Sequence, residues 1–89
     1  MSDLNELRSE IDVIDREIID LFRRRMRVAL DIAEYKRENS VPVTDSGRES
    51  DILKKVAELA GEELAPYAEE LYRSMFEVSK AYQRKSIGR

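Results

Sequence analysis

The chain has 89 residues, of which 16 are basic and 19 acidic, and it contains no cysteine, histidine or tryptophan. The missing thiols and imidazoles exclude a disulfide framework, a cysteine or histidine nucleophile and the usual zinc and haem ligands, and they favour a reducing compartment. Because the formal net charge is −3, no positive excess is present to hold a phosphate backbone, and we expect no nucleic-acid partner.

The ends and length of the chain predict a small cytoplasmic protein. Residues 1–8 are polar and mixed in charge, and no apolar run approaches the ~20 residues that a membrane span needs. We therefore expect no membrane association. A chain of 89 residues makes one domain at most, and a single core of this size gives only marginal stability, which favours help from a partner chain.

Neither proline nor glycine interrupts residues 4–38. Apolar residues recur there every three or four positions, which is the period of a helix. Asp3 or Ser2 can cap the start, and Pro42 follows the end. At ~1.5 Å per residue this helix would be roughly 50 Å long, which is much longer than a globule of this size.

Two shorter helices are predicted after the long one. The second covers about 47–60, and Gly61 ends it. The third covers about 66–85 and opens with Pro66, a residue that suits the first turn of a helix. No pattern indicates a strand or a repeat, so the sequence predicts an all-α fold of three helices.

The apolar stripe of the 4–38 helix is too long for the two shorter helices to cover. Together they barely match its length, so the surplus stripe needs another chain. We expect an intertwined homodimeric helical bundle, in which the two long helices pack along each other.

Four polar residues lie inside these apolar helix faces. With residues placed at ~100° steps, Arg25 and Lys36 fall within the stripe of the long helix. On the third helix, Ser79 and Gln83 fall about 20° to either side of Tyr72. Burying an unpaired cation costs several kcal/mol and an unpaired amide roughly 1–3 kcal/mol, so these groups need compensation.

Two explanations account for these polar groups. Arg25 and Lys36 could pair with internal carboxylates or carry their charges to solvent on long stems. The joint occurrence of two cations, a hydroxyl and an amide instead favours a preorganised pocket for a small dianion. Arg25 and Lys36 are roughly 16 Å apart along the axis, so they could grip one molecule. Arg8 is roughly 25 Å before Arg25, so it could join them only from another subunit.

The segment 42–49 between the first two helices offers Asp45, Arg48 and Glu49. Their spacing alone indicates that these residues cap the start of the second helix. Ser46 and Glu49 fit a capping box, and Asp45 fits an N-cap or turn residue.

Four motifs follow one another along the chain. They are Leu7-Arg8-x-x-Ile11-Asp12-x-x-Asp15, then Arg24-Arg25 with Ala33-Glu34-Tyr35-Lys36, then Pro42-Val43-x-Asp45-x-x-Arg48-Glu49, and finally Ser79-Lys80-Ala81-Tyr82-Gln83. In this order they resemble the small all-α chorismate mutases over essentially the whole chain. The resemblance implies a single domain over residues 1–89 and an isomerase that converts chorismate to prephenate in phenylalanine and tyrosine biosynthesis. It implies no metal, no cofactor and no covalent intermediate.

The resemblance also implies roles for the residues of the helix faces. Arg25 and Arg8 of the partner subunit would hold the two carboxylates of the substrate, with Ser79 assisting at one of them. Lys36 and Gln83 would contact the ether oxygen whose bond breaks, which makes them the main candidates for stabilising the transition state.

In the turn, the resemblance competes with the capping interpretation. Glu49, together with the backbone near Asp45 and Arg48, would take the ring hydroxyl of the substrate. One side chain cannot easily do this and cap a helix, and we favour substrate binding for Glu49. Arg48 would either contact the substrate or orient Glu49. The expected catalytic residues are thus Arg25, Lys36, Glu49 and Gln83.

Two alternative functions stay open at this point. A related lyase that eliminates pyruvate from isochorismate uses a similar scaffold, although its relatives have a different turn from the Asp-x-x-Arg-Glu arrangement here. A helical interaction or regulatory module would instead use the polar residues to set its register, but such modules usually bury one isolated polar residue. A chorismate mutase of this kind could also associate with another shikimate-pathway enzyme.

Overall fold

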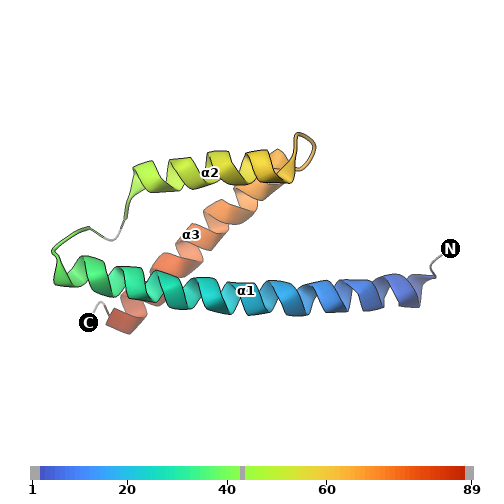
Figure 1. Cartoon of the computed structure of the whole chain (residues 1–89), viewed down its shortest axis with the longest axis horizontal. Coiled ribbons are helices and arrows are strands. Elements are labelled where there is room, and N and C mark those ends of the chain that lie inside the picture. Colours follow the sequence, from blue (N-terminus) through green and yellow to red (C-terminus); the bar gives the residue numbers. More distant parts are fainter. Residues whose placement is uncertain (1–2, 43, 88–89) are drawn as a thin grey trace.

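Three helices make up the computed structural model, which describes residues 3–42 and 44–87 (Figure 1). They are α1 (Leu4–Glu38), α2 (Ser46–Ala60) and α3 (Ala65–Ile87). The all-α fold of three helices is confirmed, and the helices begin and end close to the predicted positions. None of the helices in the described ranges combines the length and apolarity that crossing a lipid bilayer requires.

Short-range contacts fix the ends of the helices. The Asp3 carboxylate accepts a hydrogen bond of 2.8 Å from the N–H of Glu6, which satisfies one of the free donors in the first turn of α1. At α2, the Asp45 carboxylate accepts a hydrogen bond of 3.0 Å from the N–H of Arg48. Gly61 ends α2 with a φ of 87°, a conformation that glycine adopts without a steric penalty.

The central element is α3, because α1 and α2 both pack against it and not against each other. In Figure 1, α3 runs diagonally from the end of α2 and passes behind the carboxyl-terminal half of α1. The most buried residues belong to α1 and α3: Ala33 is 1% exposed, Ser79 5% and Phe76 8%. The rings of Tyr72 and Phe76 meet edge to face with centroids 6.3 Å apart. The packing between α1 and α3 therefore forms the small core of the chain.

The amino-terminal half of α1 extends beyond the other two helices (Figure 1). Its apolar side chains are 47% to 60% exposed; they are Leu4, Leu7, Ile11, Ile14 and Ile18. The radius of gyration is 16.3 Å, whereas a compact domain of this length would have about 12 Å. One chain thus leaves this part of the stripe uncovered, as its length predicted, while the homodimer that would cover it stays a prediction.

Phe76→Ala should lower the free energy of unfolding by about 3–5 kcal/mol, because it removes a buried ring from the contact between α1 and α3. Urea unfolding at one fixed protein concentration measures this change. Lys55→Ala, at an exposed position of α2, is the control and should change stability by less than about 0.5 kcal/mol. Equal effects of the two substitutions would contradict the assigned core.

Candidate active site

One cavity of about 300 Å³ is bounded by all three helices. This volume is at the lower end of the range for small-molecule sites. Its polar wall contains all but one of the predicted site residues, namely Arg25, Lys36, Asp45, Arg48, Glu49, Ser79 and Gln83. Its apolar wall consists of Val28, Ala29, Ile32, Ile52 and Phe76. The fold therefore brings together residues that lie far apart in the sequence, on three different helices.

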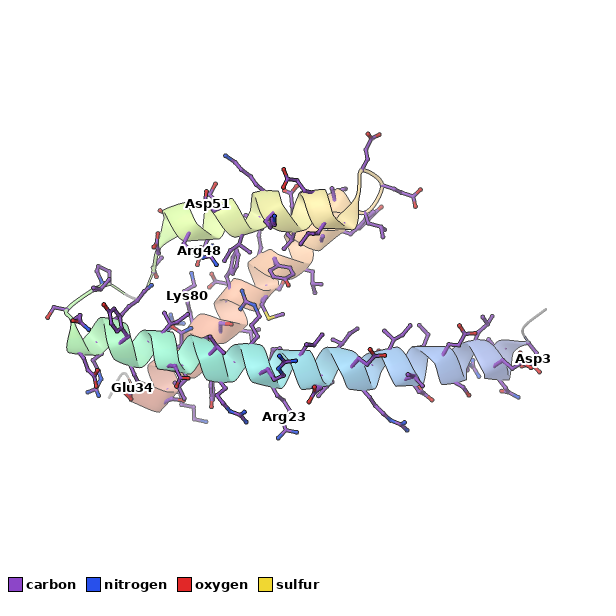
Figure 2. All side chains as sticks on the ribbon, viewed as in Figure 1. Asp3, Arg23, Glu34, Arg48, Asp51 and Lys80 are labelled. Carbon is purple, nitrogen blue, oxygen red and sulfur yellow. The ribbon has the colours of Figure 1, made fainter. Side chains whose placement is uncertain are left out.

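The directions of the charged side chains distinguish the cavity from the outer surface. In Figure 2, Arg48 extends from α2 and Lys80 from α3 toward the space between the helices. Arg23 points away from the other helices on the opposite side of α1. The outward direction of Arg23 agrees with the helix projection, in which only some of the many charged residues of α1 fall on its inner face.

Contacts with α3 hold Arg25 at the cavity. Its Nη1 donates to Ser79 Oγ at 3.5 Å, a long hydrogen bond, and its guanidinium carbon lies 5.5 Å from the centre of the Tyr72 ring. The buried Ser79 hydroxyl in turn donates to the Met26 sulfur at 3.4 Å. In the described part of the chain, no carboxylate pairs with Arg25. Its positive charge is therefore available to an anionic ligand.

Lys36 and Gln83 approach the cavity from different helices. Lys36 belongs to the last turn of α1, and Gln83 lies near the end of α3. Both are half-buried and line the same cavity. An ammonium and an amide N–H₂ group on two walls can donate hydrogen bonds to one ligand between them.

The carboxylates of the turn have separate tasks. Asp45 rather than Ser46 caps α2, through the N–H of Arg48. The Glu49 carboxylate instead forms an ion pair with Lys80 of α3, with Oε2 and Nζ 3.3 Å apart. Glu49 therefore does not close the capping box with Ser46 and remains at the cavity wall.

Lys80 is a cavity residue to which the sequence assigned no role. Its Nζ lies 3.1 Å from Glu77 and 3.3 Å from Glu49, and its side chain is 15% exposed. The hydrogen bond to Glu77 and the pairing with Glu49 raise the pKa of Lys80, and together they outweigh the opposing effect of burial. The available signal was its spacing of three residues from Gln83, which places the two on one helix face.

Arg8 lies outside this cavity, on the exposed amino-terminal half of α1. Within one chain the structure does not bring it to the other predicted residues. This position is compatible with a contribution from a second subunit, and that contribution stays a prediction.

Lys80→Met should lower the free energy of unfolding near neutral pH, and this difference from wild type should shrink in alkaline solution. Because the pKa of Lys80 is raised above its ordinary 10.5, its ion pairs stabilise the fold fully below that value. This contribution is lost as the pH rises through the folded-state pKa. Urea unfolding of both proteins from about pH 7 to 12 measures the effect. A constant difference across this range would indicate that only the packing of the lysine stem contributes.

Comparison with known proteins relates the sequence to one family. The chain matches the model of the chorismate mutase type II family over residues 7–84. It is 33% identical over 90 residues to a bifunctional chorismate mutase/prephenate dehydratase of Buchnera aphidicola. The aligned region covers 99% of this chain but only 23% of that relative. It is 31% identical over 86 residues to a chorismate mutase of Methanocaldococcus jannaschii, which covers 94% of this chain and 87% of the relative.

A third relative is named for a different substrate. It is a 4-amino-4-deoxychorismate mutase of Streptomyces venezuelae, 34% identical over 61 residues, which covers 68% of this chain and 59% of the relative. No solved structure matches the chain. The family match extends over most of the sequence and includes every residue that lines the cavity. The chain belongs to the chorismate mutase type II family.

Proposed function

We propose that this chain catalyses the rearrangement of chorismate to prephenate in aromatic amino acid biosynthesis. The observation that carries the proposal is the single cavity in which Arg25, Lys36, Glu49 and Gln83 meet. Family membership supports it. Chorismate has two carboxylates, a ring hydroxyl and an ether oxygen, and the cavity supplies cations, a carboxylate and an amide for groups of these kinds.

The reaction makes limited demands on the protein. A Claisen rearrangement breaks the ether C–O bond and forms a C–C bond within one molecule, so it needs no nucleophile and no proton transfer. The protein can accelerate it by holding the folded conformer in which the reacting carbons are close. It can also place donors where negative charge develops on the ether oxygen. Side chains fixed on three packed helices suit both tasks.

Arg25 is the proposed clamp for one substrate carboxylate. A guanidinium can donate two parallel hydrogen bonds to a planar carboxylate. The contacts with Ser79 and Tyr72 hold the guanidinium before the ligand arrives, which reduces the entropy lost on binding.

Lys36 and Gln83 are the proposed donors to the ether oxygen. Their hydrogen bonds would strengthen as the C–O bond breaks, so they would stabilise the transition state more than the bound substrate. Glu49 would accept a hydrogen bond from the ring hydroxyl. The half-buried positions of all three keep these interactions partly shielded from water.

The active form that we propose is a homodimer. The exposed apolar stripe on the amino-terminal half of α1 would pack against the same helix of a second chain. Arg8 of the partner subunit would then reach the cavity and hold the second carboxylate. The exposed position of Arg8 in a single chain supports this arrangement, since no carboxylate in the described part of the chain pairs with it.

We also propose a cytoplasmic location and association with another enzyme of the same pathway. The name of the Buchnera aphidicola relative joins a mutase with a prephenate dehydratase in one protein, which supports such an association. Copurification with a prephenate-consuming enzyme would test this partner.

Purified protein mixed with chorismate should consume it and produce prephenate, which the loss of chorismate absorbance and chromatography of the product can follow. Isochorismate is the matched control, and release of pyruvate from it would favour the lyase alternative. 4-Amino-4-deoxychorismate is a second candidate substrate because of the relative named for it. An absence of chorismate turnover would contradict the proposed function.

Gln83→Ala should lower kcat for chorismate by about 10²–10³-fold with a smaller change in KM, because it removes a donor needed mainly in the transition state. Steady-state kinetics measure both constants. The control is Lys55→Ala, which should leave both unchanged because Lys55 is exposed on α2 outside the cavity. Because an amide does not titrate, wild-type activity should vary little around neutral pH. An equal loss in both variants would exclude a specific role for Gln83.

Mixing inactive Arg8→Ala and Lys36→Ala chains tests the shared site. In a heterodimer, one of the two sites would combine an intact Lys36 with an intact Arg8. Random exchange of chains should therefore restore about a quarter of the wild-type activity. Lack of any restoration, despite exchange detected by mass spectrometry, would argue against Arg8 acting across subunits.

A further inference from the structure

Lys80 is a charged residue of the cavity wall for which the proposed mechanism has no use. Its ammonium bridges two carboxylates, at 3.3 Å from Glu49 Oε2 and 3.1 Å from Glu77 Oε2. The two partners differ in exposure, because the Glu49 side chain is 28% exposed and the Glu77 side chain 72%. The more buried pair, between Lys80 and Glu49, faces the cavity and is less screened by solvent.

Two carboxylates line the cavity in the described part of the chain, and Glu49 is the more buried of them. Asp45 also lines the cavity, but its carboxylate accepts the N–H of Arg48 as the cap of α2. The ion pair with Lys80 uses Oε2 of Glu49, so Oε1 can still accept a hydrogen bond. Carboxylates of a dianionic ligand are drawn to the cavity cations. The ligand group that meets Glu49 is therefore a hydrogen-bond donor.

The charge of that donor determines whether Lys80 helps or hinders it. An unpaired carboxylate attracts an ammonium group more strongly than a neutral hydroxyl, because the first contact is between two charges. An ammonium bound to Oε1 of Glu49 would lie within about 6 Å of the Lys80 ammonium, where like charges in a half-buried site repel. A neutral hydroxyl makes its hydrogen bond to the same oxygen without this repulsion.

We propose that Lys80 makes the site selective for a hydroxyl over an ammonium group at the ring position that faces Glu49. This inference rests on the proposed function and adds to it a choice between two substrates. Chorismate carries a hydroxyl at that position, and 4-amino-4-deoxychorismate carries a basic amine instead. Lys80 acts through Glu49, so it is a positioning and specificity residue. Because the pKa of Lys80 is raised, the lysine keeps its charge throughout the neutral pH range.

The test compares kcat/KM for chorismate and for 4-amino-4-deoxychorismate in the full chain. Wild type should prefer chorismate. In Lys80→Met, which keeps the length of the stem without the charge, the ratio of the two values should shift toward the amino substrate by about tenfold or more. Lys80→Arg keeps a cation and should retain the wild-type ratio within about threefold. Lys55→Met is the exposed control on α2 and should leave the ratio unchanged.

Circular dichroism and thermal unfolding establish that each variant is folded, and Lys80→Gln replaces Lys80→Met if the latter is not. A general loss of structure would lower both kcat/KM values together, whereas the proposed role changes their ratio. A wild-type preference for the amino substrate overturns the inference but leaves a mutase in place, and so does an unchanged ratio in the uncharged variant. A wild type that converts neither substrate contradicts the proposed function itself and this inference with it.

Discussion

Removing a positive charge from water costs several kcal/mol unless an anion or hydrogen-bond acceptors compensate it. The inner face of α1 bears two half-buried cations, Arg25 and Lys36. In the described part of the chain, Arg25 contacts the hydroxyl of Ser79 and the ring face of Tyr72, neither of which carries a negative charge. A bound dianion would complete this compensation. Placing cations on the inner face of α1 costs folding free energy, but it also makes the cavity attractive to an anionic ligand.

Much of the fold and of the site could be predicted from the sequence, because local rules govern both. The helical period and the end signals Asp3 and Gly61 determine where helices begin and end. The same period fixes the angular position of each side chain, so Arg25 and Gln83 could be assigned to inner faces before any packing was known. The cavity then collects these residues because α3 packs against both other helices.

Other features depend on contacts that local rules do not specify. Lys80 meets Glu49 only because α2 and α3 pack at a particular angle and register. This ion pair directs the Glu49 carboxylate toward α3. The Asp45 carboxylate caps α2 by accepting the N–H of Arg48, whereas Glu49 lines the cavity. The uncovered stripe of α1 could be foreseen from helix lengths, whereas its partner lies outside a single chain.

A crystal structure of the protein with a dianionic analogue of the rearrangement transition state would test the central claim most directly. We expect one carboxylate of the analogue to contact Arg25, and Lys36 and Gln83 to donate to its ether oxygen. Arg8 of the partner subunit should hold the other carboxylate. An analogue bound outside this cavity, or bound within it while the Arg8 side chains of both subunits remain in solvent, would contradict the proposed site.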